Sequence, residues 1–129
     1  MPILADCHMH SSFSGDSKAP MEDMIKQAIS LGLKEICFTE HQDFDFIYND
    51  DEPKDMFNVN TDSYLYDLIK YKEKYRSQIS VSFGVELGMQ AHLSRKLVAY
   101  AKNYDFDFII ASSHLCNRKD PYFPSFYEG

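Results

Sequence analysis

The sequence has 129 residues, of which 44% are hydrophobic and 15% aromatic, enough to bury a core in one folded unit and to exclude a disordered chain. Its formal net charge of -7, with no basic stripe, disfavours nucleic acid and anionic membranes as partners. No apolar stretch approaches the roughly 20 residues of a membrane span, no signal peptide is visible, and three cysteines, an odd number, fit reduced thiols, so we expect a cytoplasmic protein.

The first predicted elements are a strand at residues 3–6 and a helix that begins at Met21. The strand leads directly into His8 and His10. The helix has apolar residues at helical spacing, acidic residues in its first turn and Gly32 as its stop. The first strand therefore ends at a pair of histidines.

A second strand is predicted at residues 36–39, where consecutive apolar residues are typical of a parallel strand covered on both faces. His41 comes shortly after it, so the second strand also ends at a histidine. The segment 42–60 is longer than the usual connection of about 4 to 6 residues, and such loops are often functional. We interpret this segment as a lid.

The next helix is predicted to begin at an N-cap, Thr61, and to have one apolar side. That side consists of Tyr64, Leu65, Leu68, Ile69 and Tyr75. Residues 79–85 then alternate in polarity as a strand does, and Glu86 follows them. The third strand thus ends at a carboxylate.

A third helix and a fourth strand complete the pattern. The helix should place Leu93, Leu97, Val98 and Ala101 inward. The strand covers residues 106–111 and leads to His114, and the tail at 117–129 has no periodicity. Repeated alternation of strand and helix predicts a parallel α/β sheet or barrel, in which all strand carboxyl ends lie at one edge.

Histidines gather at this edge, where ligand sites form in parallel α/β folds. Of the five histidines, only His92 falls within a helix. His8 and His10 are two residues apart and should leave an extended strand on one face, while Cys7 leaves on the other and is expected to be buried. On its own, such a histidine pair could equally lie in a core or on the surface.

Two carboxylates and two further histidines extend the candidate site. Glu86 closes an apolar strand, so cations, or a salt bridge to a lysine or arginine, should neutralise it. Asp16 lies in a glycine-containing loop that could reach the strand ends, although alone it would be a turn or cap residue. His41 and His114 could individually be core histidines, and their shared placement makes them candidates. The candidate metal ligands are His8, His10, Asp16, His41, Glu86 and His114, a nitrogen and oxygen set that suits Zn, Mn or Fe.

Four segments resemble, in order and spacing, the first motifs of the PHP phosphoesterase family. They are Asp6-Cys7-His8-Met9-His10, Thr39-Glu40-His41, Gly84-Val85-Glu86-Leu87-Gly88 and Ser112-Ser113-His114. Two further segments resemble the histidinol-phosphatase branch, namely Phe13-Ser14-Gly15-Asp16 and Asp120-Pro121-Tyr122. The resemblance covers the whole chain, but only the first half of such an enzyme.

The resemblance implies a distorted (β/α)7 TIM-like barrel, of which residues 1–129 would form about half, as the N-terminal portion of a single PHP domain. The family's later ligands, a histidine and an Asp-x-His, have no counterpart here. Many wider family members have histidine at position 16, so Asp16 is a departure. Up to three divalent metal ions are implied, the first held by His8 and His10, the first and second bridged by Glu86, the second held by His114 and the third by Asp16 and His41.

A complete enzyme of this kind is expected to hydrolyse a small phosphate monoester, most closely L-histidinol phosphate in histidine biosynthesis. Metal-bound hydroxide would be the nucleophile, so no catalytic side chain is required, and the isolated chain should be inactive or weakly active. Arg118 and Lys119 could contact substrate phosphate or form a solvated basic pair.

Two alternatives stay open. One is the PHP portion of an exonuclease or protein-tyrosine phosphatase, and the other is a PHP-like domain that performs no chemistry. A half-barrel would also expose an edge strand and apolar surface, which predicts a homodimer or other self-association through the open side.

Overall fold

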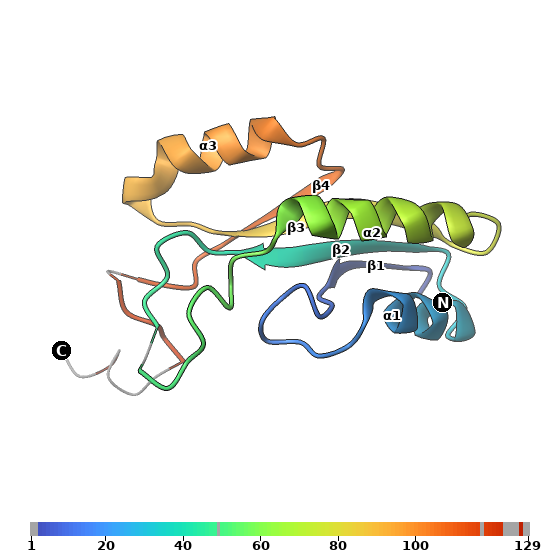
Figure 1. Ribbon diagram of the computed structural model, residues 1–129, viewed down its shortest axis with the longest axis horizontal. Helices are drawn as coiled ribbons and strands as arrows, with labels where there is room; N and C mark the ends of the chain where they lie inside the picture. Colours follow the sequence, from blue (N-terminus) through green and yellow to red (C-terminus); the bar gives the residue numbers. More distant parts are fainter. Residues whose placement is uncertain (1–2, 49, 117, 123–126, 128–129) are drawn as a thin grey trace.

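The structure of the protein is a computed structural model that describes residues 3–48, 50–116, 118–122 and 127. Its strands form one parallel sheet in the order β1-β2-β3-β4 (Figure 1). The strands are β1 at Ala5–Met9, β2 at Glu35–Gln42, β3 at Ser80–Gly88 and β4 at Phe108–Ser112. The helices are α1 at Met21–Ser30, α2 at Thr61–Lys74 and α3 at Ser94–Asn103, the last preceded by a 3-10 turn, η1, at Ala91–Leu93. None of the helices described is long and apolar enough to cross a membrane.

The register of the strands shows which side chains share each face of the sheet. Ile36 and Phe38 of β2 are register partners of Val81 and Phe83 of β3, and all of them are buried. These residues pack in one core with α1 and α2. The residues between them point the other way, so the opposite face is left for polar groups.

Tyr64 of α2 anchors this helix to the sheet. Its side chain is fully buried, and its hydroxyl shares its single hydrogen between the backbone carbonyls of Phe38, at 2.9 Å, and Gly84, at 2.7 Å. A buried hydroxyl needs such partners, since an unpaired one would destabilise the fold. The bonds fix α2 across β2 and β3, close to the strand ends that carry the polar groups.

A second, smaller apolar cluster lies under α3. It consists of Val85, Leu87, Leu93 and Leu97, with Phe44, Tyr100 and Phe106 packed against it. The prediction that Val98 points inward is wrong, because its side chain is 53% exposed. Ile69, which was predicted on the apolar side of α2, is likewise exposed. Both lie on the outer side of helices whose opposite side already covers the sheet.

The cap of α2 also differs from the prediction. The N-cap is Asn60 and not Thr61, because the Asn60 side chain accepts a hydrogen bond from the Ser63 backbone N–H at 3.2 Å. Asn60 has an extended backbone and asparagine is among the strongest N-caps. Thr61 is the first helical residue, and its hydroxyl is hydrogen-bonded to the Tyr100 hydroxyl at 2.7 Å.

A β-bulge in β1 changes the direction of the first histidines. Asp6 is the register partner of Ile36, and Met9 is the partner of Phe38, so β1 contains one more residue than β2 over the same length. A bulge of this kind re-aims the side chains that follow it. It places Met9 on the buried helix side.

The expectation that Cys7 is buried on the face opposite His8 is wrong, and the bulge is the reason. Cys7 is exposed, while Met9 is buried. The strict alternation used in the prediction holds only for an unbroken strand. With the extra residue, Cys7 and His8 both fall between the two register pairs that face the helices, on the open side of the sheet.

Candidate metal centre

Histidines and a glutamate meet on the open face at the carboxyl ends of the strands. His41 of β2 and Glu86 of β3 are direct register partners. Both strands extend further than predicted, to Gln42 and Gly88, so that these side chains leave from paired strands and not from loops. β1 brings His8 to the same edge. The alternation of strand and helix thus has the predicted effect of gathering the histidines.

Glu86 lies at the centre of this group. Its side chain is 4% exposed and its carboxylate contacts four imidazoles. The distances are 2.9 Å to His8 Nε2, 2.9 Å to His41 Nδ1, 3.6 Å to His114 Nε2 and 3.7 Å to His10 Nε2. The imidazoles also contact one another, with His8 and His10 Nε2 atoms 3.2 Å apart.

The contacts keep Glu86 ionised. Burial would raise the pKa of its carboxyl, but the contact with His41 and the charges of His114 and His10 outweigh burial and lower the pKa to about 2. Burial acts to lower the pKa of His41, but Glu86 and the Asp16 charge outweigh it and raise that pKa. The pKa of His10 is lowered, first by burial and then by the neighbouring charge of His41.

Two groups of these side chains have the composition and spacing of metal ligands. The ligand atoms of His8, His10 and Glu86 lie within 4.8 Å of one another, and so do those of His41, Glu86 and His114. Glu86 belongs to both groups, as a bridging carboxylate would. Imidazole nitrogen and carboxylate oxygen are donors that suit Zn, Mn and Fe.

A further sign of fit is the Nδ1 atom of His41. This atom is buried and, among the residues that the structure describes, has no hydrogen-bond partner, since its 2.9 Å contact with Glu86 Oε2 lacks hydrogen-bond geometry. A buried imidazole nitrogen without a hydrogen-bond partner destabilises the fold unless something binds it. A divalent cation between His41 and Glu86 would meet the need of both groups.

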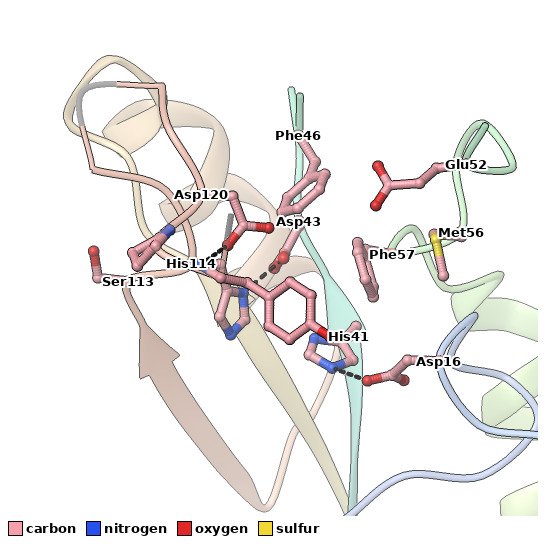
Figure 2. A pocket seen from close by; sticks show the side chains of 12 residues that line it. Asp16, His41, Asp43, Phe46, Glu52, Met56, Phe57, Ser113, His114 and Asp120 are labelled. Carbon is pink, nitrogen blue, oxygen red and sulfur yellow. Dashed lines mark hydrogen bonds and ion pairs between the residues drawn. The ribbon is translucent and has the colours of Figure 1, made fainter. Parts of the chain in front are cut away.

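Asp16 reaches the cluster through the loop between β1 and α1. Its Oδ2 atom lies 3.1 Å from His41 Nε2, as Figure 2 shows. Gly15 makes this approach possible, because its N–H donates to the Met56 carbonyl at 2.7 Å and a Cβ there would collide with that carbonyl. Asp16 and His41 thus lie close enough to share an ion, but Asp16 is outside both three-residue groups, so its role as a ligand stays a prediction.

Sequence reasoning missed Asp43, which directly supports His114. Its side chain is 3% exposed, and its Oδ2 atom lies 2.6 Å from His114 Nδ1 (Figure 2). This hydrogen bond is the first cause of a raised pKa of His114. Gly88 provides the room, since a Cβ at that position would overlap the Asp43 carboxylate. The available signal was the two-residue spacing from His41, which is the same as that between His8 and His10.

Glu40 was also missed, although it lies in one of the motifs. Its side chain is fully buried and accepts hydrogen bonds from the Ser11 backbone N–H at 2.8 Å and the Ser11 hydroxyl at 2.6 Å. The Ser14 hydroxyl also donates to it. Burial raises the pKa of Glu40, and the hydrogen bonds from the two serines oppose that rise. The available signal was a carboxylate directly before the candidate ligand His41.

A cleft of about 630 Å³ adjoins the cluster. Its walls include Asp16, His41, Asp43 and His114, and Figure 2 shows Phe46 and Phe57 facing the same space. Asp120, Pro121 and Tyr122 also line the cleft, whereas the rest of the predicted tail at 117 and 123–129 lies outside the described residues except for Tyr127. The cleft is therefore both aromatic and acidic.

The segment interpreted as a lid folds back on itself beside this cleft. The Asp43 N–H donates to the Phe57 carbonyl at 2.8 Å, and the Val59 N–H donates to the His41 carbonyl at 3.2 Å. Phe46 and Phe57 pack with ring centroids 4.8 Å apart. The base of the segment is thus tied to β2, and its opening as a lid stays a prediction.

The remaining histidine, His92, and Arg118 of the basic pair contact a residue outside the cluster. His92 Nε2 contacts Asp45 Oδ2 at 2.7 Å, and Arg118 Nη1 contacts the same oxygen at 3.0 Å. Both contacts are exposed to solvent. His92 is outside the candidate ligand groups, as predicted, and Arg118 pairs with the loop.

Comparison with known proteins gives the same family throughout. Residues 6–128 match the PHP domain family. The histidinol-phosphatase of Lactococcus lactis is 34% identical over 109 residues, which cover 84% of this chain and 38% of that protein. The probable histidinol-phosphatase of Clostridium acetobutylicum is 34% identical over 126 residues, which cover 98% of this chain and 45% of that protein. The chain thus spans less than half the length of these relatives.

Solved structures agree with these sequence matches. The crystal structure of histidinol phosphate phosphatase from Lactococcus lactis, complexed with zinc, L-histidinol and phosphate, superposes with a TM-score of 0.81 at 32% identity, over 89% of this chain and 41% of that one. The putative histidinol phosphatase of Listeria monocytogenes, at 20% identity and a TM-score of 0.76, supports the fold alone, over 87% of this chain and 45% of that one. The predicted parallel α/β fold, half of a TIM-like barrel, is confirmed. With its fold, motifs and relatives in agreement, the chain belongs to the PHP domain family.

Proposed function

We propose that this chain supplies the N-terminal part of a metal-dependent phosphoesterase that hydrolyses L-histidinol phosphate to L-histidinol and phosphate. The observation that carries the proposal is the buried Glu86 carboxylate with four imidazoles around it. Such a group holds divalent cations and not a neutral ligand. The proposed ligands are His8, His10, Asp16, His41, Glu86 and His114.

The substrate assignment is supported by the relatives and by the cleft. The Lactococcus lactis structure contains zinc, L-histidinol and phosphate. In this chain the cleft beside the cluster has aromatic walls, including Phe46 and Phe57, and acidic groups such as Asp120. Flat aromatic and acidic surfaces suit a cationic amine and an imidazole ring. A phosphate group would lie toward the histidines and the remainder of the substrate toward the aromatic wall.

The chain's own residues would orient the ions and the substrate. Bound divalent cations would offset the negative charge of the phosphate oxygens and lower the pKa of a water molecule. Glu86, ionised at neutral pH, joins the His8 side of the cluster to the His114 side. Asp43 accepts from His114 Nδ1 and so leaves Nε2 facing Glu86. No side-chain nucleophile is needed for hydrolysis of this type.

We also propose that the 129 residues contain part of the metal ligands of such an enzyme and not the whole set. The chain corresponds to 38% of the Lactococcus lactis enzyme and 45% of the Clostridium acetobutylicum one. We therefore expect the chain alone to bind zinc, manganese or iron with part of the ligand set and to show weak or no hydrolysis. Up to three ions would be held in the complete enzyme.

Zinc binding and phosphate release test the two halves of the proposal separately. In the isolated chain, Glu86→Gln should weaken zinc binding by more than about 100-fold, because it removes the shared ligand and not an outer partner. Glu73→Gln is the matched control, since Glu73 is exposed and pairs with Arg76 at 3.1 Å, away from the cluster. Equal zinc affinity of the wild type and Glu86→Gln would contradict the metal site.

Activity should be measured on the protein in its natural reading frame, by phosphate release from L-histidinol phosphate. Hydrolysis of nucleic-acid ends or phosphotyrosine in place of this substrate would favour the other PHP enzymes. Tight zinc binding with no hydrolysis of any phosphoester would favour a domain without chemistry.

We also propose that the isolated chain self-associates through its open side. In the described sheet β1 and β4 each have one neighbour, and Phe108 and Ile109 of β4 are exposed. Unpaired edges and exposed apolar side chains favour association. Sedimentation should show species larger than a monomer, and a monomer at high concentration would contradict this expectation.

A further inference from the structure

Glu40 is a buried carboxylate that none of the proposed steps uses. It projects from β2 on the side opposite His41, next to it in sequence, and its side chain is fully buried. Within the described residues its hydrogen-bond partners are serines of the loop that follows β1. A buried carboxylate destabilises the fold unless hydrogen-bond donors surround it, and an apolar side chain would fill the same space without that cost. A role for Glu40 is therefore to be sought in the contacts that its donors make.

The first partner, Ser11, fixes one oxygen of Glu40. The backbone N–H of Ser11 donates to Oε1 at 2.8 Å, and the Ser11 hydroxyl donates to the same oxygen at 2.6 Å. A backbone N–H can only donate, so this oxygen must be an acceptor. The other oxygen, Oε2, is left for Ser14.

The second partner, Ser14, connects Glu40 to the metal cluster. Its hydroxyl donates its single hydrogen to Glu40 Oε2. Its oxygen accepts the backbone N–H of His41 at 3.0 Å and lies 3.4 Å from Nδ1 of His10. The Ser14 side chain is 1% exposed, so solvent does not compete for these contacts.

The proton count of Ser14 determines the tautomer of His10. A hydroxyl has one hydrogen, and here Glu40 accepts it. The remaining contact between Ser14 and His10 can be a hydrogen bond only if His10 carries its proton on Nδ1. The Nε2 atom of His10 is then unprotonated, and it is this atom that faces His8 Nε2 at 3.2 Å and Glu86 at 3.7 Å.

We propose that Glu40 is a positioning residue which, through Ser14, holds His10 in the tautomer whose Nε2 is free to bind a metal ion. The inference rests on the proposed metal site and adds to it a residue that touches neither ion nor substrate. Outer partners that orient a ligand histidine typically contribute 10- to 100-fold in metal affinity, on the order of the effect expected here. The ring of His10 also stacks on that of His41, with centroids 4.3 Å apart and planes 5° apart, so the orientation of His10 constrains that of His41.

The variant that tests this role is Glu40→Gln, which keeps the shape of the side chain and reverses the direction of its hydrogen bond with Ser14. Because the Ser11 N–H can only donate, the amide oxygen must face Ser11 and the amide nitrogen must face Ser14. Ser14 then accepts from the amide and turns its own hydrogen to His10 Nδ1. His10 should therefore change to the tautomer protonated on Nε2, which blocks its ligand atom.

Two measurements on the full chain test this sequence of events. Imidazole nitrogen NMR of the metal-free chain, at about pH 8 where histidine is neutral, should show Nδ1–H at His10 in the wild type and Nε2–H in Glu40→Gln. Titration with zinc alone should show affinity lowered by about 10- to 100-fold in the variant. Glu73→Gln is the matched control and should change neither measurement.

Ser14→Ala keeps the proposal testable if Glu40→Gln unfolds. Removing the hydroxyl should leave His10 with a mixture of both tautomers and weaker zinc binding. A purely structural role for Glu40 would lower stability without changing the tautomer. An unchanged His10 tautomer in folded Glu40→Gln or Ser14→Ala would overturn the proposal, whereas a wild-type chain that binds no zinc would overturn the metal site and leave the tautomer result to be judged by itself.

Discussion

Replacing Gly88 by alanine tests whether the Asp43 carboxylate depends on the space beside β3. An ideal Cβ at position 88 would lie 2.6 Å from Asp43 Cγ and 3.1 Å from its Cβ, and would overlap Oδ1. The carboxylate cannot stay in place, so its 2.6 Å hydrogen bond to His114 should break. A hydrogen bond to a charged group contributes about 1.5–3 kcal/mol, and we expect a loss of this order in the free energy of unfolding.

A double-mutant cycle separates this cause from a general effect of alanine in a strand. Gly88→Ala should cost about 1.5–3 kcal/mol in the wild type, and at least about 1 kcal/mol less when Asp43→Ala has already removed the carboxylate. Urea unfolding followed by far-ultraviolet circular dichroism measures both, because the sequence contains no tryptophan. An equal cost of Gly88→Ala in both backgrounds would show that the substitution does not act through the Asp43 carboxylate.

Two other predictions concern stability alone. Tyr64→Phe should lower the free energy of unfolding by about 1–3 kcal/mol, because the carbonyls of Phe38 and Gly84 lose the one hydroxyl that they share, and an unchanged urea midpoint would contradict this role. Hydrogen bonds from Lys74 and then Tyr75 lower the pKa of Glu22 from 4.5 to about 2, so ionised Glu22 stabilises the fold above about pH 4.5 and this contribution disappears as pH falls toward 2. Glu22→Gln should therefore flatten the stability profile over that range, and profiles of equal slope would contradict it.

The gathering of the histidines could be predicted from sequence because it follows from a topological rule. Parallel strands separated by helices must end at one edge, and four histidines lie at the ends of such strands or just after them. The proximity of His41 and Glu86 could be predicted without knowing their exact contacts, since any parallel pairing of the two strands brings their ends together. The same rule applies to His114 after β4.

The side chains that were misjudged depend on pairing between distant segments. Cys7 is exposed because a bulge in β1 breaks the alternation, and the bulge is defined only by the register against β2. Asp43 supports His114 across 71 positions of sequence. Asn60 and Thr61 are both good N-caps, and only the backbone conformation at the start of α2 decides between them.

A zinc titration followed by imidazole nitrogen NMR shows whether the cluster around Glu86 binds a metal ion. We expect zinc to change the resonances of the cluster histidines, His8, His10, His41 and His114, and to leave His92, which pairs with Asp45 away from the cluster, unchanged. His92 is therefore an internal control within the same sample. Zinc that leaves the cluster histidines unchanged, or that affects His92 equally, would contradict a metal centre built around Glu86.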